Sequence, residues 1–183
     1  MPSSPAAELP SPREPGGPYR VCLVCLGNIC RSPMAETVLR AELDRAGLGG
    51  AVTVDSAGTG DWHIGDRMDP GARAALARRG YDGSTHRARQ FDASWLGRCD
   101  LVLAMDARNL ADLRRMAPAA EAGRIGLFGE VGGLTDAATG GGGGGEIPDP
   151  WGGGPDEFGY VLDLLGAAAP VIAGRLPRVL QPR

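Results

Sequence analysis

The chain has 183 residues, of which 43% are apolar and 22% charged, and its formal net charge is -3. This length and apolar content are typical of a single globular domain with a sizeable core. Because the chain is slightly acidic, it has too little basic surface for us to expect a nucleic-acid partner. No segment is expected to cross a membrane, and no secretory signal is expected.

The first predicted feature of the chain is a tail. Residues 1–18 are rich in proline, serine and glycine and contain no apolar run, so we expect them to be disordered. The domain itself is expected over residues 19–175, followed by a second tail over residues 176–183. All four cysteines of the chain lie in or beside apolar segments, which together with the missing secretory signal favours free thiols and a cytoplasmic location.

The first predicted strand covers residues 20–25, which are almost all apolar and include β-branched residues, as expected for a strand buried on both faces. A helix is predicted soon after it, over residues 33–46, with the hydroxyl of Ser32 as its cap, Pro33 in its first turn and Gly47 as its stop. Backbone N–H groups and the positive end of the helix dipole converge at such a junction. The junction is therefore a predicted anion site.

The loop at this junction, residues 26–31, is called the phosphate loop below. Cys25 lies at its foot, where the inward N–H groups and the guanidinium of Arg31 favour the thiolate, the nucleophilic form of cysteine. The planar fork of Arg31 can hold two oxygens of a phosphate group. Gly27 and Asn28 are residue types that accept left-handed backbone, which such a loop needs to turn its N–H groups inward. This pattern predicts a cysteine that attacks a phosphate group held by an arginine.

Three alternative roles for these residues are weaker. A cysteine in a buried strand is most often a packing residue. Cys22 and Cys25 also form the C-x-x-C pattern of zinc sites and redox dithiols, but an odd separation on a strand sends the two side chains to opposite faces. Gly27 is not followed by the Gly-Lys-Ser/Thr of a nucleotide-binding Walker loop. We therefore expect neither a metal nor a nucleotide here.

The rest of the chain alternates strand and helix patterns. Asp69-Pro70 and Asp106 are signals for helix N-termini, and Asp106 is expected to be structural rather than catalytic. This alternation predicts an α/β fold whose parallel sheet is covered by helices on both faces, with the ligand site beyond the carboxyl ends of the strands. The further strands are predicted at residues 51–55, 100–104 and 124–128, and the further helices at residues 70–79, 107–117 and 156–175.

A glycine-rich insert is predicted at residues 139–145, where residues 140–145 are an unbroken glycine run. We interpret it as a lengthened surface loop without functional consequence. The alternative hypothesis is that the run lets the following loop open and close more freely, because Asp149 comes only a few residues later.

Asp149 lies between two prolines, Pro148 and Pro150, which restrict its backbone and present its carboxyl group from a stiffened turn. A carboxyl group in that setting suits a general acid. It can protonate the oxygen that leaves phosphorus, and as a carboxylate it can then activate the water that cleaves the thiophosphate. An ordinary Asx turn beside proline is the alternative.

Residues 24–33 together with Asp149-Pro150-Trp151 resemble the low-molecular-weight protein tyrosine phosphatase family. The resemblance continues through most of the chain, in order and at similar spacing, in residues 54–59, Asp61-Trp62, Gly65 and residues 85–90 and 103–106. It implies a single-domain, phosphatase I-like fold with a four-stranded parallel sheet in the order 2-1-3-4. It also implies a protein-tyrosine-phosphatase that needs no cofactor.

The resemblance assigns roles to individual residues. It implies Cys25 as the nucleophile, Arg31 as the phosphate clamp and Asp149 as the general acid. It further implies a polar network that fixes the phosphate loop, formed by Asn28, Ser32, Ser56 and His86. The expected substrate-binding residues are Leu26, Gly27, Asn28, Ile29, Cys30, Ser32, Trp62, His63 and Trp151.

A thiolate at the floor of a pocket reaches phosphorus on a long, flat phenol more readily than on a short serine. Tyrosine-phosphorylated proteins are therefore the expected substrates, with inorganic phosphate or other oxyanions binding in the same site. The resemblance places Trp62 and Trp151 at the pocket walls, where they stack on the phenyl ring; the alternative is that each is a partly buried core residue. The family more often has two tyrosines after Asp-Pro, whereas Trp151 is followed here by three glycines, which bears on peptide preference rather than on chemistry.

The resemblance also suggests a reversible disulfide between Cys25 and Cys30 that shields the nucleophile, the alternative being that Cys30 only fills space. Cys99 is expected to be inert.

Three rival functions fit parts of the same pattern. A thioredoxin-coupled arsenate reductase needs further relay cysteines, of which only Cys99 is available. Protein-arginine phosphatases of this fold resemble this loop with threonine at Ile29, and a non-catalytic phosphoprotein-binding module does not need the intact catalytic residues.

Overall fold

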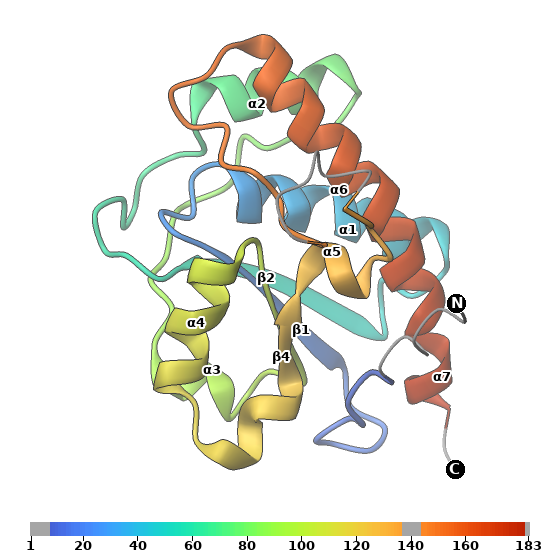
Figure 1. The fold of residues 1–183 in the computed structure, drawn as a ribbon. Helices are drawn as coiled ribbons and strands as arrows, with labels where there is room; N and C mark the ends of the chain where they lie inside the picture. The colour runs from blue at the N-terminus through green and yellow to red at the C-terminus, as the bar shows by residue number, and fades with distance from the viewer. Residues whose placement is uncertain (1–7, 137–143, 182–183) are drawn as a thin grey trace.

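The computed structural model describes residues 8–136 and 144–181. Four parallel strands form one sheet in the order β2-β1-β3-β4 (Figure 1). These strands are β1 (Tyr19–Cys25), β2 (Val52–Gly58), β3 (Leu101–Ala104) and β4 (Ile125–Leu127). β1 is central and pairs with β2 along its whole length and with β3 over residues 21–24. The predicted α/β fold with strand order 2-1-3-4 is confirmed.

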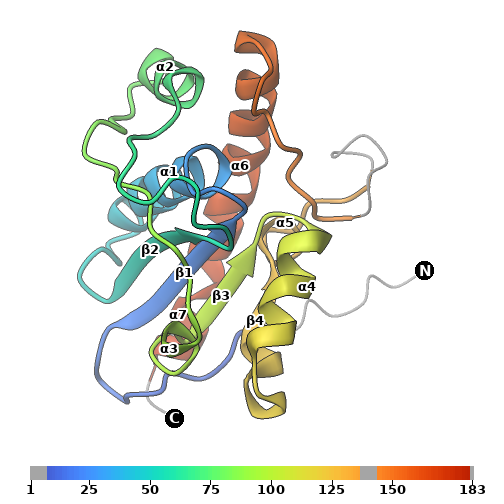
Figure 2. The same ribbon diagram turned by 90° about the vertical axis from the view of Figure 1, so that its left-hand side faces the viewer.

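Helices cover both faces of this sheet (Figures 1 and 2). One face carries α1 (Arg31–Arg45), α2 (Pro70–Arg78) and α6 (Pro155–Arg175), and the other carries α3 (Ala93–Leu96) and α4 (Ala107–Met116). The remaining short segments are η1 (Ala119–Arg124), α5 (Phe128–Val131) and α7 (Pro177–Leu180). The four long helices were predicted, whereas α3, η1, α5 and α7 were not, because segments of four to six residues are too short to show helical periodicity.

The sheet separates two apolar clusters. Leu23 and Cys25 face the cluster under α1 and α6, whereas Cys22 and Val24 face the other cluster together with Cys99. Successive side chains of a strand point to opposite faces, which explains this division. The prediction that Cys22 and Cys25 point to opposite faces is therefore confirmed.

The helix ends agree with the predictions except at α1. Asp69 and Asp106 cap α2 and α4 as predicted, by accepting hydrogen bonds from backbone N–H groups of their first turns. Gly47 follows the end of α1 with a φ of 71°, which suits glycine. However, α1 begins two residues earlier than predicted, and its N-cap residue, Cys30, makes no side-chain cap hydrogen bond. The prediction of Ser32 as the cap is wrong, because its hydroxyl group is used elsewhere.

Residues 8–18 pack against the amino ends of the strands. Leu9 is buried in the larger apolar cluster. The backbone N–H of Arg13 donates to the buried carboxylate of Asp100 at 2.6 Å, and the Arg13 guanidinium donates to backbone carbonyl oxygens at the end of α3 and just before β3. The expectation of a disordered N-terminal tail is therefore wrong for residues 8–18, and residues 1–7 lie outside the described residues.

The C-terminal helix pair also departs from expectation. The 26 residues Pro155–Leu180, spanning α6 and α7, are long and apolar enough to cross a membrane by length and composition, contrary to the expectation that no segment is. Half of the most apolar stretch is buried, and α6 packs along α1, so that α6 is a core helix in this structure. Leu176 is buried, so residues 176–181 belong to the packed domain rather than to the expected tail.

Candidate active site

The phosphate loop connects the carboxyl end of β1 to the first turn of α1 and surrounds the sulfur of Cys25. The backbone N–H of Asn28 donates to the Cys25 Sγ at 3.3 Å, and the Ser32 Oγ lies 3.0 Å from the same sulfur. The first N–H groups of α1 have no partners within the helix, and the positive end of its dipole adds to the attraction for an anion. The sulfur is therefore surrounded by groups that stabilise negative charge.

Two glycines allow the backbone to pack this closely. A Cβ at Gly58, the last residue of β2, would lie 2.7 Å from the carbonyl oxygen of Leu26, so that the strand end packs directly on the loop. A Cβ at Gly27 would lie 3.0 Å from Cδ2 of His63. Asn28 adopts the predicted left-handed backbone, with a φ of 56°, whereas Gly27 does not. Gly27 thus provides space for His63 rather than a turn.

A polar network holds the loop from behind. The Nδ2 of Asn28 donates to the hydroxyl oxygens of Ser32 and Ser56, both at 2.9 Å, and the Nε2 of His86 donates to the Asn28 carbonyl oxygen at 2.7 Å. The structure thus brings together all four residues that the resemblance placed in this network. It adds Glu36, a buried carboxylate of α1 that accepts a hydrogen bond from the Ser56 hydroxyl group. Sequence reasoning missed Glu36 because a glutamate in an amphipathic helix usually faces solvent.

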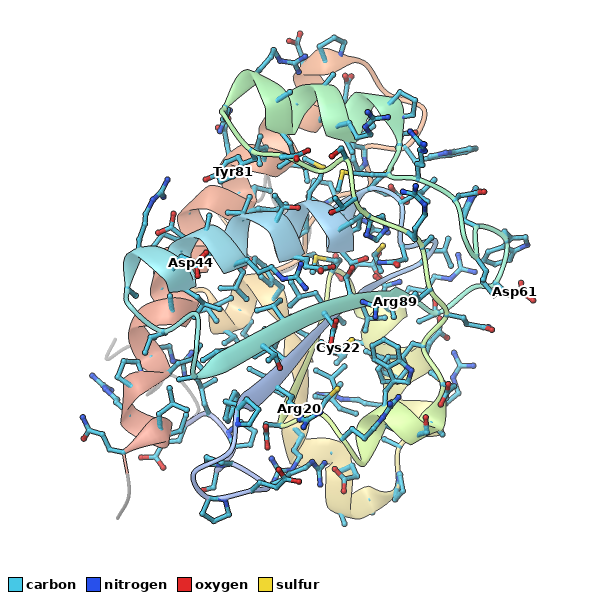
Figure 3. All side chains as sticks on the ribbon, turned by 180° about the vertical axis from the view of Figure 1, so that it is seen from behind. Arg20, Cys22, Asp44, Asp61, Tyr81 and Arg89 are labelled. Carbon is cyan, nitrogen blue, oxygen red and sulfur yellow. The ribbon has the colours of Figure 1, made fainter. Side chains whose placement is uncertain are left out.

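A segment distant in sequence supports the same network. The backbone N–H of Arg89 donates to the Oδ1 of Asn28 at 2.9 Å. Figure 3 shows Arg89 at the carboxyl end of β2, close to the phosphate loop, and Asp61 on the outer edge of the loop after β2. Every hydrogen-bonding group of the Asn28 side chain therefore has a partner, which fixes the backbone N–H of Asn28 opposite the Cys25 sulfur.

A pocket with a volume of about 170 Å³ lies above the Cys25 sulfur. It is lined by Cys25, Leu26, Gly27, Ile29, Cys30, Arg31, Trp62, His63, Asp149 and Trp151. These are the predicted site residues with the exception of Asn28 and Ser32, which are completely buried behind the loop. Their side chains support the loop and do not line the pocket, and the prediction that these two residues bind substrate stays a prediction.

Arg31 is held at the pocket by two carboxylates and a carbonyl group. Its side chain is only 3% exposed, and its Nη1 donates to the Oδ2 of Asp106 at 2.5 Å and to the carbonyl oxygen of Ile147 at 3.2 Å. Its Nη2 donates to the Oδ2 of Asp149 at 3.2 Å. Burial lowers the pKa of Arg31, but attraction to Cys25, Asp106 and Asp149 outweighs it, and the pKa is raised. The guanidinium therefore remains charged.

Asp106 has two roles in this arrangement. Its Oδ1 accepts the N–H of Asn109 at 2.8 Å and so caps α4, as the sequence predicted, while its Oδ2 holds Arg31. The expectation that Asp106 is structural was incomplete. Sequence reasoning missed the second role because the cap already explained an aspartate at this position.

Asp149 lies in residues 144–154, the segment that leads into α6 and is drawn in orange in Figure 2, and it lines the pocket. Its Oδ1 accepts the backbone N–H of Trp151 at 3.1 Å, which forms the alternative Asx turn. Its Oδ2 binds Arg31, and its side chain is 45% exposed. The Asx turn and the placement of the carboxyl group at the pocket are therefore compatible, because the turn points the carboxyl group toward the pocket.

Two tryptophans flank the mouth of the pocket. Trp62 is 70% exposed and Trp151 is 67% exposed, which excludes the alternative that they are core residues. The ring of Trp62 lies against Gly60, where a Cβ would overlap it. His63 lines the pocket beside Trp62, and its Nδ1 lies 3.0 Å from the Oδ2 of Asp66. The mouth thus presents two flat apolar surfaces next to one ionisable ring.

All four cysteines of the chain are free thiols in the structure. Cys30 is buried beside Cys25 in the pocket wall, and burial is the main cause that raises its pKa, with the negative charges of Asp69 and Cys25 adding to it. Its thiol is therefore neutral when Cys25 is an anion. The disulfide between Cys25 and Cys30 stays a prediction.

The fold and the site agree with comparisons to known proteins. Residues 20–181 match the family model of the low molecular weight phosphotyrosine protein phosphatases. The low molecular weight protein-tyrosine-phosphatase of Streptomyces coelicolor is 51% identical over 152 residues, which cover 82% of this chain and 89% of that protein. The low molecular weight phosphotyrosine protein phosphatase of Schizosaccharomyces pombe is 41% identical over 141 residues, covering 76% of this chain and 85% of that protein.

Solved structures of related proteins have the same fold. A protein tyrosine phosphatase from Entamoeba histolytica, crystallised with Hepes in its active site, superposes with a TM-score of 0.80 at 31% identity, covering 87% of this chain and 97% of that one. YfkJ from Bacillus subtilis superposes with a TM-score of 0.78 at 32% identity, covering 91% of this chain and 99% of that one. The chain therefore belongs to the low molecular weight phosphotyrosine protein phosphatase family.

Proposed function

We propose that the protein is a protein-tyrosine-phosphatase that hydrolyses phosphotyrosine in proteins through a cysteinyl-phosphate intermediate. One observation carries the proposal: Cys25, Arg31 and Asp149 line one pocket whose mouth is flanked by two exposed tryptophans. The pocket thus combines a nucleophile, a fixed positive charge and a carboxyl group with walls that fit a phenyl ring.

The first chemical step transfers the phosphoryl group to the enzyme. The phosphate binds between the N–H groups of the phosphate loop and the guanidinium of Arg31, which neutralise its oxygens. The Cys25 thiolate attacks phosphorus, and the bond from phosphorus to the phenolic oxygen breaks. Asp149, in its protonated form, gives its proton to that oxygen, so that neutral tyrosine leaves and a sulfur–phosphorus bond has formed.

The second step hydrolyses the intermediate. The carboxylate of Asp149 now accepts a proton from a water molecule, whose oxygen attacks phosphorus as the sulfur–phosphorus bond breaks. Inorganic phosphate leaves, the Cys25 thiolate returns and Asp149 is again protonated. The same side chain therefore serves as acid in one step and as base in the next, as its place at the pocket mouth allows.

The pocket also supports the choice of phosphotyrosine over phosphoserine. Cys25 lies at its floor, whereas Trp62 and Trp151 lie at its mouth, so that a substrate must place a flat group between the two rings to bring phosphorus to the sulfur. A serine side chain is too short to do so. Because inorganic phosphate is the product, it is the oxyanion expected to compete with substrate.

The arrangement of cysteines favours this proposal over an arsenate reductase. Such an enzyme passes a disulfide outward from its nucleophile to further cysteines. Cys22 and Cys99 pack in the cluster on the opposite face of the sheet from Cys25, so they are badly placed for this relay.

The four free thiols also support the proposal that the protein works in the reducing cytoplasm.

Phosphate release from matched phosphotyrosine and phosphoserine peptides tests the proposal. The wild-type protein is expected to hydrolyse the phosphotyrosine peptide and to leave the phosphoserine peptide intact. Cys25→Ser is expected to lose turnover by several orders of magnitude, because it removes the nucleophile, while still binding the phosphotyrosine peptide. Equal hydrolysis of both peptides, or an active Cys25→Ser protein, would contradict the proposal.

A further inference from the structure

The segment that precedes Asp149 is anchored before it reaches the pocket. Gly145 has a φ of 93° and packs so closely on the backbone of α5 that a Cβ on Gly145 would overlap Glu130, and one on Gly129 would overlap Gly145. Ile147 is completely buried, and its N–H donates to the carbonyl oxygen of Met105 at 2.7 Å. The backbone is therefore fixed on both sides of Glu146.

Glu146 ties this segment to a helix terminus. Its Oε1 accepts the backbone N–H of Ala107 at 2.7 Å. Ala107 is the first residue of α4, and a first-turn N–H has no partner within its own helix. A carboxylate at this position is also favoured by the positive end of the helix dipole. The contact thus satisfies a donor that would otherwise need water.

The same short junction holds the arginine. Asp106, next to Ala107, binds the Nη1 of Arg31, and the carbonyl oxygen of Ile147 binds the same nitrogen. The junction between β3 and α4 therefore contacts both the phosphate clamp and the segment that carries the general acid. Displacing Glu146 from α4 would change the position of the acid relative to the clamp.

The chain between this anchor and the acid is stiff. Only Pro148 separates Ile147 from Asp149, and Pro150 follows, so two of the backbone torsions around the acid are fixed by proline rings. A movement of the anchor is therefore passed on to the Asp149 carboxyl group rather than absorbed. Misplacing a catalytic group by about 1 Å can cost on the order of 100-fold in rate.

We propose that Glu146 is a positioning residue for the general acid: by binding the N-terminus of α4 it sets the distance between the Asp149 carboxyl group and the leaving oxygen. Glu146 does not line the pocket and acts through Asp149. The proposal rests on the proposed function of this site. The glycine-rich insert predicted at residues 139–145 reaches this anchor with Gly144 and Gly145, and its residues 139–143 lie outside the described residues.

The test compares two aryl phosphates that differ in their need for an acid. Phenyl phosphate has a poor leaving group that must be protonated, whereas 2,4-dinitrophenyl phosphate has a good one that leaves without help. The measured quantity is kcat/KM, which reports on the first chemical step. Glu146→Ala is expected to lower kcat/KM about tenfold on phenyl phosphate and less than about twofold on 2,4-dinitrophenyl phosphate.

Three further variants calibrate the result. Asp149→Asn is expected to give the same dependence on the leaving group with a larger loss on phenyl phosphate. Glu146→Gln keeps an acceptor oxygen for Ala107 and is expected to recover part of the activity. Glu14→Ala removes an exposed negative charge at the opposite end of the sheet and is expected to leave the kcat/KM of both substrates unchanged. The urea midpoint of each variant checks its folding.

The outcomes separate the two proposals. If Glu146→Ala lowers kcat/KM equally on both substrates, or on neither, Glu146 does not position the acid and the inference is wrong. If Glu146→Ala fails to fold, the dependence on the leaving group measured for Glu146→Gln decides in the same way. A wild-type protein that hydrolyses neither aryl phosphate would instead overturn the proposed function.

Discussion

Arg31 shows how single residues set the chemistry of this site. A buried guanidinium needs partners, and here Asp106, Asp149 and the carbonyl group of Ile147 supply them. The nitrogens of the guanidinium point where these partners hold them, so the Arg31 side chain is preorganised before any ligand binds. Asp106 is the nearest of these partners, and it also caps α4.

Replacing Asp106 with asparagine separates these two roles. Asparagine is an equally good N-cap, so α4 should be retained, but the charge that holds Arg31 is lost. We expect kcat/KM on phenyl phosphate to fall about tenfold. Asp92→Asn is the control, since Asp92 caps α3 and has no contact with Arg31 among the contacts of the described residues. An Asp106→Asn protein with wild-type kcat/KM would show that the ion pair is dispensable.

The reactivity of Cys30 can be predicted from its burial. Because burial raises its pKa, the Cys30 thiol stays protonated at pH 7 to a greater extent than a free cysteine, and it becomes a thiolate only at a higher pH. In a folded Cys25→Ser protein we expect no alkylation of Cys30 by iodoacetamide at pH 7, and full alkylation after unfolding in urea. Mass spectrometry of the labelled peptides measures both. Labelling of Cys30 as fast as in urea would contradict this prediction.

At the scale of elements, the site depends on how the end of β2 packs on the phosphate loop. Gly58 pairs with Cys25 in the parallel sheet, and its missing side chain lets β2 touch the backbone of Leu26 and Asn28. β2 also runs three residues further than predicted, so that Ser56 lies in the strand. The strand thereby carries the Ser56 hydroxyl to the side chain of Asn28.

Gly58→Ala tests this packing. The added Cβ must push the loop backbone away, and such overpacking costs about 1 to 3 kcal/mol of the free energy of unfolding. We also expect a loss of kcat/KM, because the N–H groups around the sulfur move with the loop. Gly166→Ala, in an exposed part of α6 with nothing near its Cβ, is the control and is expected to gain about 0.5 to 1 kcal/mol. Urea unfolding and aryl phosphate kinetics measure the two effects; an unperturbed Gly58→Ala protein would refute the argument.

At the scale of the whole molecule, the pocket and the N-terminal segment of residues 8–18 lie at opposite ends of the sheet. The pocket residues gather beyond the carboxyl ends of the strands, whereas residues 8–18 pack against the amino ends through Leu9 and the hydrogen bond from Arg13 to Asp100. Changes in this N-terminal segment should therefore alter stability without altering the chemistry of the folded protein.

Leu9→Ala is the substitution that tests this separation. Removing a buried leucine side chain costs about 2 to 5 kcal/mol, so we expect a lower urea midpoint. Below that midpoint, kcat/KM on phenyl phosphate should equal the wild-type value, because Leu9 lies far from the pocket residues in the fold. Glu14→Ala, at an exposed position of the same segment, should change neither quantity. A loss of kcat/KM in a fully folded Leu9→Ala protein would show that the two ends are coupled.

The sequence by itself determined the features that depend on neighbouring residues. The apolar run before Cys25, the proline and glycine at the ends of α1, and the aspartates before α2 and α4 act within one or two turns of the chain, so their pattern predicts strands, helices and a parallel sheet. The resemblance to a known family then supplied the roles of Cys25, Arg31 and Asp149, which line one pocket as expected.

Only the tertiary structure decided which distant groups meet. In the sequence, Glu36 looks like an ordinary helix residue, Asp106 like a helix cap and Glu146 like a loop residue. In the structure, Glu36 contacts Ser56, Asp106 contacts Arg31, and Glu146 contacts the start of α4. These contacts exist only because the fold brings their segments together at the carboxyl ends of the strands. The role of the Ser32 hydroxyl was also decided by the tertiary structure. The local pattern predicts a helix cap, but in the folded chain the hydroxyl contacts the buried Asn28 side chain and the Cys25 sulfur instead. Local sequence fixes backbone torsions, whereas long-range packing selects hydrogen-bond partners, and the site depends on both.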